Sequence, residues 1–526
     1  MLVFLFCVAL LIFAYFIYGT FVEKVFGIKP QRPTPAITSA DGVDYVAMPK
    51  WKIWLIQLLN IAGTGPIFGP ILGALYGPVA MLWIVIGCIF AGAVHDYCCG
   101  MISIRNNGAS IPNLAGRYLG MPIKHLINIV ALVLLVLVGV VFVRTPADLL
   151  TRLTEKAMSN ESLEAVGAAV GAVTESASGG ISGDTLMLIW ICAIFAYYII
   201  ATLLPIDKII GRIYPIFGAL LMFMTAGMLF GLLFEGIPLY QTVGLQEGLS
   251  FANFFENFHP KGLPIWPLIF ITITCGAISG FHATQTPLMA RCATNESAGR
   301  FIFYGAMITE GVIALIWCLV GLSFYPEMQG LLDATAKSPA PVVFDSAMAM
   351  LGTFGGMLAV LGVVVLPITS GDTAFRAARL QIAETLKLDQ RFIKNRLMIT
   401  LPIFAIGIYL CTIDFNVLWR YFGWANQSTA TIMLWIAAAY LYRHGKFHWI
   451  CTLPAIFMTA VCASYLFYAP IGLGWIWASM GMGDRVWDMA VICGVITTVV
   501  IVALFFTLLK PARIRTLALA PAAIDD

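Results

Sequence analysis

Charged residues are scarce in this sequence: Asp, Glu, Lys and Arg together make up 11% of its 526 residues. A chain so poor in charge cannot form the charged surface of a soluble protein. Its net charge of +3 is small and favours no nucleic-acid partner. Hydrophobic residues account for 60% of the chain, and the mean hydropathy is +0.91. Long apolar runs recur from end to end, so the sequence predicts an all-α polytopic membrane protein.

Clustered metal-binding and catalytic motifs are also lacking. The 12 cysteines are spread through apolar segments, and apart from the adjacent Cys98 and Cys99 they are too widely spaced for a CxxC zinc motif or a disulfide framework. The HExxH signature of a membrane metalloprotease does not occur in the sequence. We therefore interpret the cysteines as small core residues, and we predict no metal, no cofactor and no enzymatic activity.

Thirteen apolar segments are long enough to cross a bilayer. They cover residues 1–20, 52–76, 78–104, 121–143, 184–205, 211–234, 264–290, 300–325, 342–375, 396–415, 421–442, 448–470 and 486–510. The first segment lacks the basic start and the cleavage site of a signal peptide, so we expect it to be a retained helix. Most of the 30 Lys and Arg then fall on one side of the membrane, which predicts an external N-terminus, a cytoplasmic C-terminus and an external loop at 145–183.

The stretch NIAGTGPIFGP at residues 60–70 interrupts the second segment. A glycine inside a helix costs about 1 kcal/mol relative to alanine, and a proline costs about 3 kcal/mol. Thr64 is a residue type that caps helix starts, and Pro66 suits a first turn, so we predict a discontinuous helix with halves that meet between Ala62 and Pro66. Its freed N–H groups would face an anion or a polar substrate. The alternative is a kink that only permits close helix packing.

A second interruption, CGAISGFHATQTP at residues 275–287, lies in the seventh segment and also ends in Thr-Pro. The two interruptions are five segments apart, and this odd offset gives them opposite orientations in the membrane. Broken helices at corresponding positions are typical of an inverted-repeat transporter. We therefore predict an extra N-terminal helix at 1–22, two five-helix repeats at 51–235 and 264–443, two C-terminal helices at 448–510 and a cytoplasmic tail at 511–526.

Glu310 is an ionisable residue at membrane depth. It follows Arg300 by ten residues, which places it about 15 Å into the bilayer, near the middle. No basic residue lies within a turn or two of it in the sequence. Since desolvation favours a neutral carboxyl, Glu310 is a candidate proton carrier. The alternative is a structural hydrogen bond to a broken helix.

Asp372 lies at the inner end of the ninth segment, among the hydroxyls of Thr369, Ser370 and Thr373. A carboxylate with neighbouring hydroxyls can bind a hard cation such as sodium. It can equally form an ion pair with Arg376, one helical turn later. The sequence leaves both interpretations open.

Two histidine positions complete the set of polar candidates. His95 and Asp96 are adjacent in the third segment, where they could titrate a proton, form an ion pair or make structural hydrogen bonds. Because adjacent residues point to different helix faces, a metal site that included Cys98 and Cys99 would need ligands from elsewhere. His282 lies within the second interruption, where we expect access to a cavity; the alternative is a satisfied buried histidine.

Six stretches from the second to the eleventh segment carry a further signal. They read NIAGTGPIFGPILGALYGP (60–78), AGAVHDY (91–97), RNNGAS (105–110), CGAISGFHA (275–283), YGAMITEG (304–311) and YFGWANQS (421–428). In this order they resemble the carbon starvation protein A family of bacterial inner-membrane transporters. The resemblance implies secondary uptake of peptides or pyruvate during nutrient limitation. It also implies the five-plus-five inverted repeat of the amino acid–polyamine transporter superfamily.

The sequence thus predicts a secondary active importer of peptides or pyruvate-like carboxylates, with the proton as the preferred coupling ion. The predicted substrate-binding residues are Gly63, Thr64, Gly65, Gly276, Ser279, Gly280, His282, Asn426 and Gln427. The predicted ion-coupling residues are Glu310, Asp372, Thr369, Ser370, Thr373, His95 and Asp96. A sodium-coupled amino acid or peptide transporter and a nutrient-sensing receptor remain alternatives. The expected partners are a small-molecule substrate, a coupling ion and the lipid bilayer.

Overall fold

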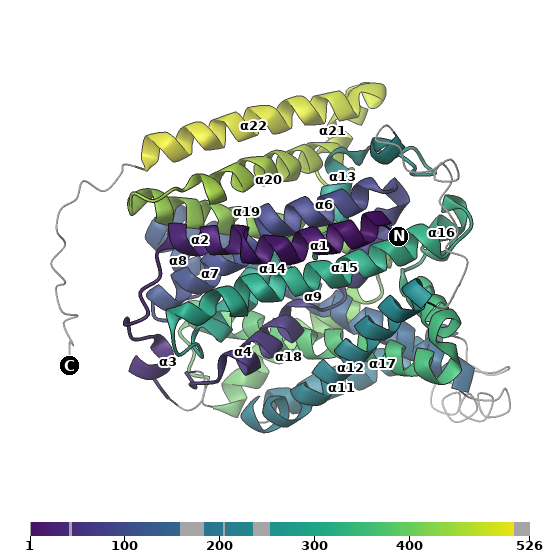
Figure 1. Cartoon of the computed structure of the whole chain (residues 1–526), viewed down its shortest axis with the longest axis horizontal. Helices are drawn as coiled ribbons and strands as arrows, with labels where there is room; N and C mark the ends of the chain where they lie inside the picture. Colours follow the sequence, from purple (N-terminus) through teal and green to yellow (C-terminus); the bar gives the residue numbers. More distant parts are fainter. Residues whose placement is uncertain are drawn as a thin grey trace.

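A computed structural model of the chain describes residues 2–41, 45–157, 183–203, 206–234, 253–390 and 392–509. Within these ranges the secondary structure is helical, apart from one isolated bridge between Met48 and Ala293. The helices form a single bundle (Figure 1). The predicted all-α class is therefore confirmed.

The helices of the bundle occupy the positions of the predicted spans. They are α1 (Leu2–Phe16), α2 (Tyr18–Phe26), α4 (Lys50–Ile61), α5 (Gly65–Gly73), α6 (Val79–Gly87), α7 (Ala93–Arg105), α9 (Met121–Ala157), α11 (Gly183–Leu203), α12 (Ile206–Phe234), α13 (Ile265–Thr272), α14 (Gly280–Ala290), α15 (Gly305–Ser323), α17 (Ala340–Leu386), α18 (Ile393–Leu410), α19 (Phe415–Arg443), α20 (Trp449–Tyr468) and α22 (Val486–Leu508). Short helices connect them: α3 (Pro35–Thr38), α8 (Ile111–Tyr118), α16 (Met328–Ala334) and α21 (Gly474–Ser479).

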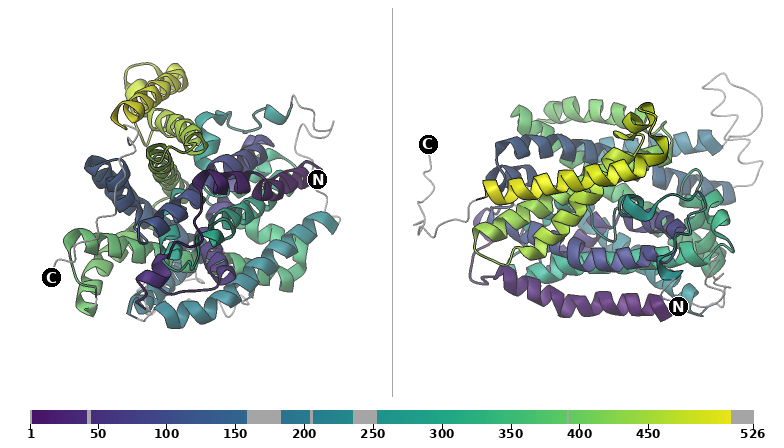
Figure 2. Two further views of the ribbon diagram at one scale, coloured as in Figure 1. Left: turned by 60° about the vertical axis from the view of Figure 1, so that its left-hand side comes forward. Right: turned by 90° about the horizontal axis from the view of Figure 1, so that it is seen from above.

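Ten spans in the described part of the chain are long and apolar enough to cross a membrane, and the bent pair α4–α5 makes an eleventh. The pair α13–α14 and helix α19 occupy the two remaining predicted positions. Burial separates the centre of the bundle from its edge. In the span that contains α15, 83% of the most apolar stretch is buried, against 22% in the span that contains α22. Helices α20 and α22 lie side by side at one edge in both sets of views (Figures 1 and 2).

The first predicted break is confirmed. Helix α4 ends at Ile61, α5 begins at Gly65, and the two are bent by 49°. Pro66 lies in the first turn of α5, as predicted. The predicted cap by Thr64 is wrong: its hydroxyl makes no capping hydrogen bond, because its backbone is already α-helical (φ −77°, ψ −14°) rather than in the extended conformation that capping requires.

The second break is confirmed as well, but it lies earlier than the Thr-Pro pair suggested. The non-helical residues are 273–279, and Pro287 lies inside α14. A proline within a helix leaves the carbonyl four residues earlier without its N–H donor. Here that carbonyl, of Ala283, accepts from Cys99 Sγ at 3.7 Å, and the hydroxyl of Thr286 bonds to the carbonyl of His282 at 2.7 Å. The carbonyl that the proline leaves free thus has a partner inside the bundle, and α14 continues through Pro287.

Helix α9 is longer than the predicted span, which ended at residue 143. It continues through Arg144 to Ala157, so the first part of the predicted loop at 145–183 is helical. The charge of Arg144 does not end the helix, because its guanidinium donates to the carbonyls of Cys411 and Ile413 at the end of α18. The remainder of that loop, residues 158–182, and the predicted tail at 511–526 lie outside the described residues.

Two further irregular helical segments are separated by the same number of spans as the two breaks. A π-helical segment, η2 (Cys88–Gly92), separates α6 from α7, and another, η5 (Arg300–Tyr304), precedes α15. They lie in the third and eighth spans, again five spans apart. Such segments are rare and occur often at functional sites. This spacing agrees with the predicted repeats, whose boundaries remain a prediction.

Candidate functional site

The two breaks lie against each other at the centre of the bundle. Gly65, at the start of α5, approaches Cys275 of the second break so closely that an added Cβ would overlap the Cys275 sulfur. One turn further on, the same face of α5 packs on the carbonyl of Thr272, the last residue of α13. A glycine at 65 leaves room for the Cβ and sulfur of Cys275, which any larger residue would displace.

The four predicted site glycines are packed rather than open. An added Cβ at Gly63 would overlap the ring of Phe142, and one at Gly276 or Gly280 would overlap α15 or α19. Gly276 also has a φ of +84°, a conformation that favours glycine. These residues therefore border the junction of the breaks and not an open cavity in this structure.

Helix α19 supplies the hydrogen bonds that the second break lacks. Asn426 Nδ2 donates to the carbonyl of Thr274 at 3.0 Å, and Asn426 Oδ1 accepts from the backbone N–H of Phe281 at 2.7 Å and from the Ser279 hydroxyl at 3.2 Å. Gln427 Nε2 donates to the carbonyl of Phe270 at 2.8 Å. Both amides are buried, so they replace the water that irregular backbone at membrane depth would otherwise need.

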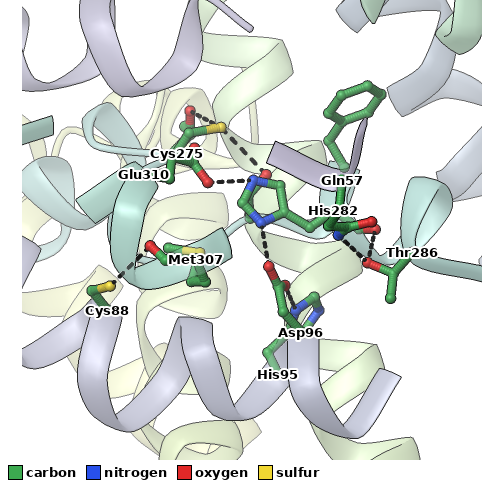
Figure 3. A network of polar contacts seen from close by, with 12 residues as sticks. Gln57, Cys88, His95, Asp96, Cys275, His282, Thr286, Met307 and Glu310 are labelled. Carbon is green, nitrogen blue, oxygen red and sulfur yellow. Dashed lines mark hydrogen bonds and ion pairs between the residues drawn. The ribbon is translucent and has the colours of Figure 1, made fainter. Parts of the chain in front are cut away.

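A chain of ionisable side chains runs beside the second break (Figure 3). Asp96 on α7 contacts Nδ1 of His95 at 2.8 Å and Nδ1 of His282 at 2.9 Å. The other ring nitrogen of His282, Nε2, lies 3.2 Å from a carboxylate oxygen of Glu310 on α15. All four side chains are fully buried. The structure thus brings together three predicted coupling residues and one predicted substrate residue from three helices.

This arrangement has one proton to share. With its Nδ1–H donated to Asp96, the His282 ring can hold a second proton on Nε2 and donate it to an ionised Glu310, or it can accept a hydrogen bond from a neutral Glu310. The two states differ by the transfer of one proton across a single contact. Glu310 is therefore placed to gain or lose a proton while it stays paired to the broken helix.

The same region offers donors of the kind that bind metals. One ligand atom each from Cys275, His282 and Glu310 lies within 4.8 Å of the others. Each of these side chains also has a protein contact, since the Cys275 sulfur lies 3.3 Å from the Ser279 hydroxyl and Nε2 of His282 faces Glu310. Hydrogen bonding and proton sharing account for the cluster, and we assign no metal to it.

The residues around Asp372 do not gather in this way. Asp372 contacts Arg376, one turn along its own helix, at 3.0 Å. The hydroxyls of Thr369 and Thr373 bond to carbonyls of that same helix. Two of these residues reach other helices: the Ser370 hydroxyl donates to the carbonyl of Leu59 on α4 at 3.1 Å, and Nη2 of Arg376 donates to the carbonyl of Ala201 on α11 at 3.4 Å. Each of the three hydroxyls thus donates to a backbone carbonyl, and the predicted cation site at Asp372 stays a prediction.

Sequence reasoning missed a link between the two broken helices. Gln57 on α4 donates to the hydroxyl of Thr286 on α14 at 3.0 Å. Gln57 is polar within an apolar run and lies three residues before Asn60, so both fall on one face of the helix. This polar face was a signal in the sequence that could have identified Gln57. Several buried polar atoms near the breaks make no hydrogen bond to the described part of the protein: Gln57 Oε1, Thr64 Oγ1, Gln285 Oε1, Gln427 Oε1, both carboxylate oxygens of Glu310 and Nε2 of His282, of which the last lies in ion-pair contact with Glu310. Such atoms need donors or acceptors from a ligand or water.

A cavity of about 220 Å³ opens where the C-terminal half of α9 meets the starts of α11 and α19. Arg144, Asp148 and Arg152 of α9 are among its lining residues. Phe68 of α5 and Phe415 of α19 also line it, with ring centroids 5.8 Å apart. This end of the bundle is the predicted external end, and the cavity borders the first broken helix at Phe68.

Comparison with known proteins gives a consistent picture. The profile of the family described as carbon starvation protein CstA matches residues 1–174, 165–350 and 340–464. An uncharacterized membrane protein of Haemophilus influenzae is 62% identical over 348 residues, which cover 64% of this chain and 94% of that protein. The peptide transporter CstA of Escherichia coli is 25% identical over 563 residues, which cover 86% of this chain and 78% of that protein.

A second Escherichia coli relative, the pyruvate/proton symporter BtsT, is 29% identical over 374 residues, which cover 63% of this chain and only half of that protein's length. Among solved structures, MhsT in complex with L-phenylalanine superposes with a TM-score of 0.52 at 15% identity, covering 85% of this chain and 97% of MhsT. This likeness shows the fold alone. It is that of LeuT-type transporters, whose inverted repeats and discontinuous helices match the predicted architecture.

Proposed function

This chain belongs to the carbon starvation protein CstA family, and from that premise we propose that it is a secondary active transporter that imports small organic nutrients across a bacterial inner membrane. Relatives named as a peptide transporter and as a pyruvate/proton symporter support peptides or pyruvate-like carboxylates as substrates. The second name also supports the proton as the coupling ion. The nutrient is then carried by conformational change, and no covalent chemistry is required of the protein.

The substrate site is the junction of the two broken helices. Two kinds of group meet there: backbone freed by the breaks, and buried polar atoms of Gln57, Thr64 and Gln285 that have no protein partner. A carboxylate or a peptide group would satisfy both kinds. The predicted substrate residues Ser279, Asn426 and His282 hold the second break in position beside it, while Gln427 fixes the end of α13.

The observation that carries the coupling proposal is the contact between His282 and Glu310. His282 belongs to the half-helix α14 and Glu310 to α15, so the proton that they share acts between two elements. Transfer of the shared proton from His282 to Glu310 changes this contact from a charged pair to a neutral hydrogen bond, and loss of that proton to water leaves an ionised Glu310 beside a neutral ring; each change alters how strongly α14 is held to α15. Asp96 keeps the ring of His282 oriented during this change, and His95 in turn orients Asp96.

Uptake into proteoliposomes tests this function. Labelled pyruvate, alanine and dipeptides are offered in counterflow first, which identifies the substrate without any ion gradient. The substrate so found is then driven by an inward proton gradient without sodium, and separately by a sodium gradient at constant pH. We expect the proton gradient to drive uptake; uptake that ignores pH and rises steeply with sodium would overturn proton coupling.

Sodium coupling is the second candidate, and one contact favours it. Ser370 bonds to a carbonyl of α4, so the segment that carries Asp372 touches the first broken helix. A sodium ion bound by Asp372 and the neighbouring hydroxyls would then act on that helix. The sodium gradient in the same experiment, applied to wild-type protein and to Asp372→Asn, separates this scheme from the first.

The orientation in the membrane is part of the proposal. Lys387 and Lys394 should face the cytoplasm, and the segment 145–183 should face outward. Single cysteines introduced at these places in a cysteine-free background can be labelled from outside with an impermeant reagent. Strong labelling at 387, or none anywhere in 145–183, would contradict the orientation.

A further inference from the structure

The opposite end of the bundle from the cavity carries a buried carboxylate with an unusual number of partners. Glu296 lies in η4 (Glu296–Ala298), the turn between α14 and α15, and its side chain is fully buried. Arg105, at the end of α7, donates to both of its oxygens, with distances of 3.0 Å from Nε and 2.8 Å from Nη2. The backbone N–H of Lys29 adds a third hydrogen bond at 2.8 Å, and Arg32 lies 3.5 Å away.

Lys29 and Arg32 belong to a strap, the residues 27–41 and 45–48 that connect α2 to α4. The strap lies across the turn between α14 and α15. Asn295 donates to the carbonyl of Pro30 at 3.0 Å, and the N–H of Met48 donates to the carbonyl of Cys292 at 3.3 Å. The strap is therefore fastened to the inner end of the second broken helix at several points along its length.

Arg105 ties two more helices to the same point. Its Nη1 donates to the hydroxyl of Tyr440 at the end of α19 at 2.9 Å, and its Nη2 donates to the carbonyl of Gly27 at 2.8 Å. Its guanidinium also stacks over the ring of Phe26, 4.3 Å from the centroid. Lys446, in the turn after α19, donates to the carbonyl of Phe26. One arginine thus joins the ends of α2, α7 and α19 to the turn that holds Glu296.

The two ends of the bundle consequently differ. The predicted external end has a cavity of about 220 Å³ above Phe68, whereas the predicted cytoplasmic end is closed over α14 by the strap and the pair Arg105–Glu296. A substrate released to the cytoplasm must pass this closure. A buried charge cannot lose its partner without a large cost unless water or another charge replaces it. The closure is therefore expected to be either formed or open, with few intermediate states.

We propose that Arg105 and Glu296 form the inner gate of the transporter and that the strap is its lid. This proposal rests on the proposed transport function, because a gate has a role only in a transporter. The separation of Arg105 from Glu296 releases the strap, frees the inner end of α14 and exposes the path from the junction of the breaks to the cytoplasm. Neither residue belongs to the substrate or coupling groups, so both act by positioning the strap.

Cys292 is a native reporter for this gate. It lies at the end of α14 beneath the strap and is 6% exposed. Purified full-length protein in detergent is treated with a maleimide for increasing times, and modification of each cysteine is followed by mass spectrometry. In Glu296→Gln the carboxamide keeps the size of the side chain but turns an NH₂ group towards donors of Arg105. We expect Cys292 to react at least about tenfold faster than in wild type.

Three controls accompany this experiment. Glu384→Gln removes an exposed acid at the same end of the bundle and should leave the rate unchanged. Cys411, buried at the other end, should keep its rate in every variant, and Cys192, on the outer face of the span α11 and covered by detergent, should react slowly in all of them. If Glu296→Gln does not fold, Arg32→Gln serves instead. The Arg32 side chain is 39% exposed, and its loss should speed the reaction of Cys292 by about two- to threefold.

The gate is overturned if Cys292 reacts no faster in Glu296→Gln, or in its substitute, than in Glu384→Gln. It is also overturned if Cys411 accelerates equally, because that result would mean general loosening of the fold. Labelling needs neither substrate nor gradient. A failure of the gate therefore leaves the uptake experiments unaffected, and absence of uptake would not alter the labelling result.

Discussion

Two buried carboxylates in this protein have cationic partners of different origin. Asp372 pairs with Arg376 on its own helix at 3.0 Å. Glu310 pairs with His282 of another helix at 3.2 Å, and their side chains are fully buried, whereas that of Asp372 is 11% exposed. The pair on one helix moves as a unit, and its link to another helix is a single hydrogen bond from Arg376 to the carbonyl of Ala201 on α11 at 3.4 Å. A pair between two helices must change when they separate, so we expect Glu310, rather than Asp372, to link a proton to a conformational change.

The most severe test of this comparison is Glu310→Gln. The amide cannot carry a proton, so uptake driven by a pH gradient should fall by at least about 100-fold, within the range attributed to positioned acid–base groups. Exchange of labelled for unlabelled substrate needs no net proton movement and should persist. Both are measured in proteoliposomes with matched protein content. Asp372→Asn is the matched control, and a proton-driven uptake that survives in Glu310→Gln would remove Glu310 from the coupling scheme.

Substitution of Gly65 tests whether the two breaks must lie in contact for substrate to bind, a step that coupling through either Glu310 or Asp372 requires. In Gly65→Leu the new side chain would overlap the sulfur of Cys275 and push α5 away from the second break. Binding of the identified substrate should be abolished while the protein stays folded and monodisperse. Even Gly65→Ala should weaken binding by about tenfold, since overpacking costs about 1–3 kcal/mol.

Gly330→Ala provides the control for steric substitution. It lies on α16, where an added Cβ would make only an ordinary contact of 3.5 Å with Tyr325. Equilibrium binding and size-exclusion profiles should match those of wild type. Unchanged affinity in Gly65→Leu would show that the junction of the breaks is not the substrate site.

Asn426 tests the support of the second break, on which the contact between His282 and Glu310 depends. In Asn426→Ala the N–H of Phe281 and the carbonyl of Thr274 lose their partner inside the bundle. The free energy of unfolding should drop by about 3 kcal/mol, because each buried group left unpaired costs about 1–3 kcal/mol. Asn416→Ala, an exposed amide at the start of α19, should change it by less than about 1 kcal/mol. Equal thermal stability of the two variants in detergent would contradict this role.

The smallest effect is expected for Asp372→Asn. The carboxamide of Asn keeps an acceptor for Arg376, which also donates to the carbonyl of Ala201, so the substitution should lower thermal stability less than Asn426→Ala does. Uptake driven by protons should remain close to that of wild type. A collapse of uptake in this variant, together with dependence on a sodium gradient in wild type, would reverse the comparison and make Asp372 the coupling residue.

The sequence predicted the features that depend on composition and local chemistry. The scarcity of charge and the lengths of the apolar runs set the membrane class and the number of spans. Glycine and proline between Ala62 and Pro66 ended one half-helix and began the next, because backbone propensities act within a few residues. The pairing of Asp372 with Arg376 was among the expected possibilities for the same reason, since residues four apart on a helix are always neighbours.

Features that depend on distant residues were decided by the tertiary structure. Pro287 continues a helix because a cysteine from α7 meets the carbonyl that the proline leaves free. The hydroxyl of Thr64 does not cap α5, since the backbone at the break takes a helical conformation where it packs between other helices. Glu310, which has no cation near it in the sequence, meets His282, and His282 meets Asp96, only when three helices come together. Local sequence fixes where a helix can break, but the partner of a buried charge is set by which helices the bundle brings into contact.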